Sequence, residues 1–505
     1  MRRFGVRQRL DSCGMRKATA GRKACWLVLS RAKLLCVSEF RLLCMREPVL
    51  DRRNGRRCYS VAMVAACPFP ANHGTPGAIR EMSETLAQMG HTVHIVTYSG
   101  GQDDIVVRFA KVHRPSPFRP QRNVKVGPSA EKFLLDFAVL RLLCRLIQRE
   151  PIDIIHGHNY EGAVIGALAG WITRRPVLYH AVNLMSDELP GYRFIRPEWL
   201  VKRVAGLLDW LIPIFPDHII ALSPELKEWL VTNGTPERKV DVVPCGVNPD
   251  IFNSAAPANL GTSFQIRNRP IVMYTGVLNR FQRIDYLLRG FAIALNQEPD
   301  ALLLIVSPVV SEADKREHTK LAHKLGISHA IRWIGPHLLE DLPGYLALAN
   351  VTVISRPDCL GHPIKLLNYM LAGKPIVCFQ GAAKGVRHMY DAFIAPDHDC
   401  DALGKGIVTL LRNPTLAAQL GAQARATVLA TFHWRHICVD IERIYHKLVE
   451  AANQQNRSGP SARKWANVLP VESANNSKFE RDVGFSRLSQ PVENPAMIND
   501  KKARD

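Results

Sequence analysis

The segment "YSVAMVAACPFPANHGTPGAIREMSETLAQMGHTVHIVTY", residues 59–98, indicates the class of fold most clearly. Its apolar start, which ends in prolines, predicts a strand buried on both faces. Gly74 and Gly77 then predict a turn, and the apolar residues from Ile79 to Met89 recur at helical spacing. Residues 91–98 predict the next strand. Strand, glycine turn, helix and strand make one βαβ unit, so we expect a parallel α/β sheet.

The same alternation continues along the chain and restarts once. After the first unit, the pattern predicts further helices and strands as far as residue 253. The polar stretch 254–269, which contains proline and glycine, predicts a linker. A second series of strands and helices then occupies 270–431. Two such series predict two doubly wound, Rossmann-like domains that face a central cleft, with ligands at the carboxyl ends of the strands.

The two ends of the chain differ from this pattern. Residues 1–57 are arginine-rich and aperiodic, and the first 60 residues hold 16 Lys+Arg against 4 Asp+Glu. We interpret them as a basic, disordered extension, with a targeting arm, a nucleic-acid-binding arm and a misassigned start as the alternatives. Residues 432–452 predict a helix that returns to the first domain. Residues 453–505 predict a disordered tail.

Composition narrows the classes of partner. The chain has 505 residues, a formal charge of +21 and a pI of about 9.7, which favours anionic partners such as nucleic acid, acidic membrane or phosphorylated small molecules. The twelve cysteines form no C-x-x-C pair, which indicates reduced thiols and a cytoplasmic protein. No apolar run is long enough to span a bilayer. Because most of the basic excess lies in the first 60 residues without a recognition motif, we expect no nucleic-acid partner.

Six pieces of the sequence, in order, carry a resemblance to a known family. The chain resembles the retaining family-four glycosyltransferases, which have the GT-B fold. The resemblance implies transfer of a sugar from a nucleotide-diphosphate sugar to a glycan or lipid-linked acceptor, with no metal or other cofactor. The pieces are "PFPANHGTPGAIREMSETLAQMGHTVHIVTY", "DIIHGHNYEG", "DHIIALSPELKEWL", "VVPCGVNPDIF", "YTGVLNRFQRIDYLLRGF" and "LGHPIKLLNYMLAGKPIV".

The resemblance implies three contacts from the first domain. The turn that contains Gly74 and Gly77 is expected to face the donor phosphates, where absent side chains let backbone amides approach an anion. His158 is the implied catalytic residue, in contact with the transferred sugar. His156 lies two residues earlier on the same face of its strand. A metal-binding pair is the alternative, but it has no third ligand nearby in the sequence; a structural histidine is the other.

The first motif of the second domain departs from the family pattern. Gly276 suits a backbone that passes close to a diphosphate. The family commonly has Arg directly after this glycine and Lys a few residues later, where this chain has Val277 and Gln282. Arg280 and Arg283 lie nearby, and we expect them to supply the positive charge.

The stretch 360–378 departs from the family as well. The family motif is Glu-x7-Glu, and the alignment puts Leu360 and Asn368 at the two acids. Asn368 can still hydrogen-bond a ribose. The amides of Gly361 and His362 can bind the donor at a helix N-terminus. Lys365 is expected to face the diphosphate, with a solvated surface lysine as the alternative. Asp358, two residues before Leu360, is a candidate substitute for the missing acid.

A membrane surface is a further expected partner. Arginines cluster in the first half, next to two predicted amphipathic helices at 131–149 and 198–215. Together they predict docking on anionic lipid at the inner face of a membrane, with a merely solvated basic face as the alternative. The arginines are Arg108, Arg114, Arg119 and Arg122.

The sequence therefore predicts a peripheral glycosyltransferase of polysaccharide or glycoconjugate biosynthesis. Two other classes stay open: a sugar-nucleotide epimerase with the same architecture, and a non-catalytic homologue that only binds a nucleotide sugar. The second is motivated by the joint loss of the expected residues at positions 277, 282, 360 and 368.

Overall fold

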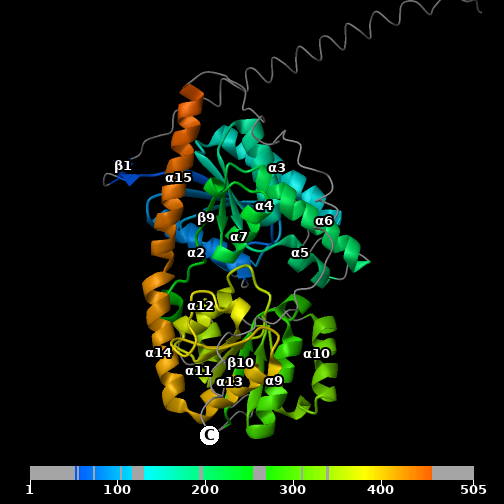
Figure 1. Cartoon of the computed structure of the whole chain (residues 1–505). Helices are drawn as coiled ribbons and strands as arrows, with labels where there is room; N and C mark the ends of the chain where they lie inside the picture. The colour runs from blue at the N-terminus through cyan, green and yellow to red at the C-terminus, as the bar shows by residue number, and fades with distance from the viewer. Residues whose placement is uncertain are drawn as a thin grey trace, which may run out of the picture. The chain divides into compact units, whose positions relative to one another are not determined.

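The structure is a computed structural model that describes residues 52–53, 56–71, 74–102, 105–116, 130–192, 197–253, 269–308, 311–336 and 341–457. All of them belong to one compact unit (Figure 1). Most of the predicted linker, the predicted tail from 458 onward, and the basic extension up to residue 51 lie outside the described residues. No helix in the described ranges is both long and apolar enough to cross a bilayer.

The first half is built on a seven-stranded parallel sheet. Its strand order is β5-β4-β3-β6-β7-β8-β9, so the chain direction across the sheet reverses between β3 and β6. The inner strands are buried throughout, which explains their continuous apolar character. The strands are β3 (Ser60–Ala65), β4 (Thr92–Thr97), β5 (Lys111–His113), β6 (Ile154–His158), β7 (Val177–Ala181), β8 (His218–Ala221) and β9 (Val240–Val242).

Helices connect these strands and cover the sheet. A short helix, α5 (Met185–Glu188), and the turn η1 (Leu189–Tyr192) follow β7, at the carboxyl edge of the sheet. The others are α2 (Gly74–Gln88), α3 (Ala130–Arg149), α4 (Asn159–Thr173), α6 (Glu198–Leu211), η2 (Ile212–Ile214), α7 (Pro224–Thr232), η3 (Glu237–Lys239) and α8 (Asp250–Asn253).

The second half repeats this plan with six parallel strands. The order is β12-β11-β10-β13-β14-β15, and the reversal falls between β10 and β13. The strands are β10 (Ile271–Thr275), β11 (Leu302–Val306), β12 (Ile331–Ile334), β13 (Val351–Ile354), β14 (Ile376–Phe379) and β15 (Phe393–Ala395). The sequence pattern did not predict β5 and β15, because each is a three-residue edge strand that is only partly buried.

The helices of the second half follow the prediction with one exception. The expected segment at 400–431 is two helices, because Pro414 occupies the first turn of the second one and the side chain of Asn413 caps it. The elements are η4 (Arg280–Gln282), α9 (Ile284–Gln297), α10 (Glu312–Lys324), η5 (Ser328–Ala330), α11 (Leu342–Leu348), α12 (Ile364–Leu371), η7 (Gln380–Ala382), α13 (Cys400–Arg412) and α14 (Pro414–Thr431).

The last helix, α15 (Trp434–Arg457), packs against α2 in the first half (Figure 1). Trp434 Nε1 donates to Glu81 Oε2 over 2.6 Å, and Tyr445 Oη lies 2.7 Å from His156 Nδ1. The helix includes residues 453–457, the first five residues of the predicted tail. Two short antiparallel strands, β1 (Arg52–Arg53) and β2 (Arg56–Arg57), lie within the extension that was predicted to be disordered. The ion pair between Arg57 and Glu450 connects β2 to the end of α15.

The two halves touch at the carboxyl ends of their strands. Ser223 Oγ donates to the carbonyl of Leu360, and Lys384 pairs with Glu225 at 2.8 Å. In doubly wound sheets the ligand crevice lies at this edge, where the strand order reverses. The segments that follow β6 and β7, and those that follow β10 and β13, therefore form the region in which a functional site is expected.

Candidate functional site

A lysine held by neutral groups lies at the mouth of the second sheet. Lys365, in the first turn of α12, donates from Nζ to Tyr274 Oη over 2.7 Å and to Gln282 Oε1 over 2.8 Å. The ammonium also lies 4.0 Å from the centre of the Tyr274 ring. A Cβ added to Gly276 would come within 2.8 Å of Nζ, and Gly276 has φ +134°. The backbone conformation and the approach of Lys365 therefore favour glycine at this position.

The surroundings of Lys365 disfavour its positive charge. Burial of the ammonium lowers the pKa of Lys365 well below its usual value, and the nearby charge of Arg356 lowers it further. The two side chains that accept from Nζ are uncharged. An anion bound at this point would favour the charged form of Lys365, because opposite charge offsets the cost of burial.

Arg356, which follows β13, is a second cation in the same region, and the sequence motifs did not single it out. The residue is 6% exposed, and its guanidinium lies 3.5 Å above the ring of Phe281 in η4. Nε donates to the carbonyl of Asp358 over 3.1 Å. Nη2 is buried and has no partner among the described residues. A buried guanidinium donor without an acceptor costs free energy unless a ligand supplies one.

The two arginines that were expected to supply charge are paired elsewhere. Arg280 forms an ion pair with Glu317 at 3.1 Å. Arg283 donates to both carboxylate oxygens of Asp285 at 3.0 Å and stacks on Tyr286. The structure therefore brings Gln282, which lies between them, to Lys365, and leaves the two guanidinium groups with carboxylates of their own.

The loop before α12 is tightly packed against the first half. A Cβ on Gly361 would come within 2.3 Å of both Asn183 Oδ1 and the Val182 carbonyl, so this backbone tolerates no side chain. Leu360 packs against an apolar cluster of the first half that also includes Tyr160 and Leu189. The position of the first family acid is thus part of an apolar contact between the halves.

The remaining residues of this loop and helix take different places. His362 is buried, and burial lowers its pKa to about 4, helped by the charge of Lys384; neither ring nitrogen has a partner among the described residues. Asn368 lies one turn after Lys365 and is partly buried. Asp358 is mostly exposed and lies 3.3 Å from His398. Asp358 is directed to that histidine rather than to the position of the missing acid.

In the first half, His158 belongs to a group of three stacked imidazoles. It ends β6, is 2% exposed, and its ring lies 4.3 Å from that of His156 and 5.2 Å from that of His180. His156 Nε2 is 3.2 Å from His180 Nδ1. Burial lowers the pKa of all three histidines, that of His180 to about 4, so each is neutral at pH 7. His158 Nε2 has no partner within the described residues.

These three histidines also bear on the metal-pair alternative. The sequence offered no third ligand near His156 and His158, but β7, the neighbouring strand, supplies His180, and one nitrogen of each residue lies within 4.8 Å of the others. The rings of His156 and His158 are stacked with an interplanar angle of 29°. Imidazole binds metals in the ring plane, so stacked rings do not converge on one ion as they stand. His156 already uses both nitrogens, toward Tyr445 and His180.

The segment that was predicted as a glycine turn is the first turn of helix α2, and it has one constrained residue. Gly74 begins α2 with φ +44°, a conformation that favours glycine. Gly77 lies in the first turn of α2, and a Cβ there would meet nothing within 4 Å. The two residues before Gly74 lie outside the described ranges. Of the two predicted glycines, only Gly74 is thus required by the backbone itself.

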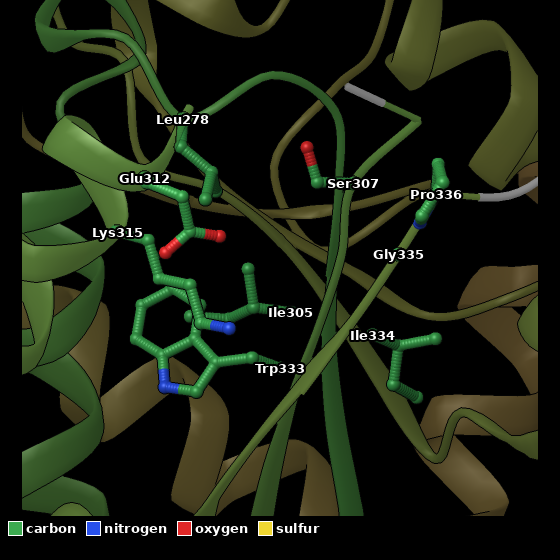
Figure 2. A pocket seen from close by; sticks show the side chains of 9 residues that line it. All are labelled: Leu278, Ile305, Ser307, Glu312, Lys315, Trp333, Ile334, Gly335 and Pro336. Atoms are coloured by element: carbon green, nitrogen blue, oxygen red, sulfur yellow. The ribbon is translucent and has the colours of Figure 1, made fainter. Parts of the chain in front are cut away.

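A cavity of about 170 Å³ opens at the carboxyl ends of β10, β11 and β12. Figure 2 shows Glu312, Lys315 and Trp333 on one side of it, with Ile334 and Pro336 across from them. Leu278, two residues after Gly276, also lines the cavity. The cavity therefore extends the same edge of the sheet that carries Lys365, and it offers an aromatic ring together with polar groups.

Comparisons with known proteins agree with this architecture. The Glycosyltransferase Family 4 model matches residues 74–251, and the model of Glycosyl transferases group 1 matches residues 269–413. A D-inositol 3-phosphate glycosyltransferase of Streptomyces avermitilis is 26% identical over 61% of this chain and 68% of its own length.

Solved structures show the same fold. Sucrose-phosphate synthase of Thermosynechococcus elongatus aligns with a TM-score of 0.65 at 20% identity, over 78% of this chain and all of the other. HepE of Anabaena, solved with UDP-glucose, aligns with a TM-score of 0.59 at 18% identity, over 77% of this chain and all of the other. The fold is GT-B, and the chain belongs to the family-four, group 1 glycosyltransferases.

Proposed function

We propose that this glycosyltransferase takes its sugar from a nucleotide-diphosphate sugar and binds the diphosphate between Arg356 and Lys365. The observation that carries the proposal is that, within the described ranges, Arg356 Nη2 has no acceptor and the nearby Lys365 ammonium has only neutral partners. Two cations that form no ion pair with a described carboxylate suit a diphosphate, because charge-assisted hydrogen bonds to phosphate are strong. Solved relatives of the same fold hold UDP-glucose or ADP, which supports this class of donor.

We also propose an orientation for the donor along the carboxyl edge of the second sheet. In the proposal the nucleobase occupies the cavity beside Trp333, the diphosphate passes Gly276, and the ribose lies near Asn368. The amides of Gly361 and His362 complete the contacts at the start of α12. Departure of the nucleoside diphosphate builds negative charge, which Arg356 and Lys365 stabilise. With this charge in place we propose that transfer needs no metal and no other cofactor.

We assign the sugar end of the donor to the first half. His158 Nε2 has no partner among the described residues and its ring is neutral, so it can hydrogen-bond a sugar hydroxyl. The turn at Gly74 and Gly77 faces the phosphates from this side in the proposal. A leaving group and an acceptor that share one face of the sugar give retention of configuration, and the protein then acts mainly by positioning.

For the acceptor we propose a glycan or a lipid-linked molecule at the inner face of an anionic membrane, in polysaccharide or glycoconjugate biosynthesis. The support is an exposed, partly apolar surface on α3, α4 and α6 of the first half, where α3 packs against α4. Its exposed aromatic residues are Phe133, Phe137, Trp171, Trp199 and Trp210. Its exposed cations are Arg141, Arg145, Arg149, Lys202 and Arg203.

The basic cluster predicted from the sequence, Arg108, Arg114, Arg119 and Arg122, contributes less to this surface. Arg108 is exposed, but Arg114 donates to the carbonyl of Phe69 over 2.9 Å, and Arg119 and Arg122 lie outside the described residues. Flotation with vesicles of phosphatidylglycerol or phosphatidylcholine tests the docking. We expect binding to the anionic vesicles only, and loss of that binding in Trp199→Ala/Trp210→Ala. Equal binding to both vesicle types, or none to either, contradicts the membrane proposal.

The enzymatic proposal is tested by a donor screen. Purified protein is incubated with UDP-glucose, ADP-glucose and related donors, with and without D-inositol 3-phosphate or a glycan acceptor, and released nucleotide and product are followed by mass spectrometry and NMR. Transfer with an unchanged anomeric configuration supports the proposal. Conversion of the donor to an isomer without an acceptor favours an epimerase, and binding without turnover favours a non-catalytic homologue.

A further inference from the structure

A carboxylate that no motif identifies stands at the crevice edge of the first half. Glu188 is the last residue of α5, beyond the carboxyl end of β7. Its Oε1 accepts from Asn183 Nδ2 over 2.8 Å, and its Oε2 accepts from Tyr160 Oη over 3.1 Å. Tyr160 lies in the first turn of α4, two residues after His158. The two donors come from the segments that follow β6 and β7, so the carboxylate is fixed from both sides.

Glu188 lies where the second half approaches most closely. Its partner Asn183 is the residue against which Gly361 packs without room for a Cβ. Its other partner, Tyr160, and the next residue, Leu189, belong to the apolar cluster that receives Leu360. The turn η1, which begins directly after Glu188, contacts η4, the turn that carries Gln282. Glu188 and Leu360 therefore both belong to the region where the two halves meet.

The surroundings leave Glu188 able to bind a further group. Burial raises the pKa of Glu188 above its ordinary value, although the bonds from Asn183 and Tyr160 and the charge of Arg356 oppose this shift. Neither hydrogen-bond partner is charged, and each oxygen accepts one of the two side-chain bonds. An ionised carboxylate offers about four acceptor positions. The remaining positions suit hydroxyl donors, which are what sugars present.

We propose that Glu188 binds a sugar hydroxyl at the reaction centre, so that the first half supplies the carboxylate that position 360 lacks. This inference rests on the proposed transferase function. The hydroxyl can belong to the sugar that is transferred or to the acceptor, and the two sources make different predictions. In both cases Glu188 acts on the sugar end of the reaction and does not contribute to binding of the nucleoside diphosphate.

The test compares Glu188→Gln with Glu198→Gln, a matched change at an exposed glutamate on α6. Glutamine keeps the size of the side chain and an oxygen for Asn183, so the fold should persist, which thermal unfolding checks. Calorimetry measures the affinities for UDP and for UDP-glucose, and turnover is measured both as hydrolysis of UDP-glucose in water and as transfer to an acceptor that the wild type uses.

The expected result is an unchanged affinity for UDP and a fall in transfer of about tenfold or more in Glu188→Gln alone. If the hydroxyl is on the transferred sugar, hydrolysis and the affinity for UDP-glucose fall as well. If it is on the acceptor, hydrolysis persists and the acceptor KM rises. A Glu188→Gln enzyme with wild-type transfer overturns the inference, as does an equal loss of UDP affinity. A wild type that turns over no donor contradicts the proposed function instead.

Discussion

The Nζ atom of Lys365 lies 2.8 Å from Oε1 of Gln282. The two residues come from α12 and η4, on either side of the β10–β13 switch point. In the pattern that the sequence resembles, position 282 holds the lysine and position 277 an arginine. Here position 282 is a glutamine, and the ammonium that contacts it belongs to Lys365 of α12. Arg356, which follows β13, stacks on Phe281 of η4. We infer that the positive charge of the donor site has been kept while the elements that supply it have changed.

The first prediction concerns Lys365→Ala. A charge-assisted contact contributes roughly 1.5–3 kcal/mol, and about 1.4 kcal/mol is tenfold in affinity. Removal of the ammonium should therefore weaken UDP binding about ten- to a hundredfold in calorimetric titrations. Asn368→Ala, which loses only neutral hydrogen bonds, should cost less. The control is Lys374→Ala, whose ammonium bonds the carbonyls of Ala347 and Ala349 away from this contact. Unchanged UDP affinity in Lys365→Ala would refute the assignment.

The second prediction concerns Leu360→Glu. Leu360 packs against an apolar cluster of the first half. Tyr160, which donates to Glu188, packs against the same cluster. A new carboxylate would be partly buried among apolar groups, where charge is disfavoured. We expect turnover of the donor to fall in Leu360→Glu. The fall should be smaller in Leu360→Gln, because glutamine has the shape of glutamate without its charge. A gain of turnover in Leu360→Glu would show instead that position 360 is a decayed catalytic acid.

The third prediction concerns the docking of α15. Tyr445 is fully buried, and its hydroxyl lies 2.7 Å from His156 Nδ1. Tyr445→Phe leaves a buried imidazole nitrogen without its partner, which costs about 1–3 kcal/mol. The free energy of unfolding in urea should fall by this amount, and amides of β6 and α2 should lose protection from hydrogen exchange. Tyr390→Phe, at a half-exposed tyrosine, is the control and should change little. Loss of protection confined to the second half would count against this packing.

The fourth prediction is a pH dependence that arises from His180. Burial lowers the pKa of His180 to about 4, whereas an unfolded histidine titrates near 6.5. The unfolded chain therefore binds the proton first as the pH falls, and the stability that His180 confers is complete above pH 6.5 and lost toward pH 4. The loss is about 1.4 kcal/mol per pH unit within that window.

The measurement for this fourth prediction is a pair of urea unfolding series at pH 8, 6 and 5. The difference in the free energy of unfolding between wild type and His180→Gln should shrink as the pH falls, because glutamine does not titrate. His329→Gln, at an exposed histidine of η5, serves as the comparison. A difference for His180→Gln that stays constant across the series would show that His180 is not the group that titrates.

The sequence predicted those parts of the molecule that depend on local pattern. Long apolar runs identified the inner strands, such as β3, and the helical repeat identified α2, because burial on both faces or along one stripe leaves a direct trace in composition. Edge strands β5 and β15 leave no such trace, since three partly exposed residues carry little pattern.

The site residues that were missed depend on distant parts of the chain. Arg356 is distinctive only because Phe281 covers it and Nη2 has no acceptor in the described structure. His180 joins His156 through the pairing of two parallel strands. Glu188 matters because Gly361 approaches Asn183 from the other half. The place of Glu188 just beyond the carboxyl end of β7 was the one signal in the sequence. No local pattern reports such contacts.

The most direct test exchanges Lys365 and Gln282, whose side chains are hydrogen-bonded. UDP is titrated by calorimetry into wild type, Lys365→Gln, and the double variant Lys365→Gln/Gln282→Lys. The account predicts that the single change lowers affinity at least about tenfold and that the double variant recovers most of it, because the ammonium returns to the same contact from η4. Wild-type affinity in Lys365→Gln, or a double variant no tighter than the single one, would contradict a diphosphate site built on this pair.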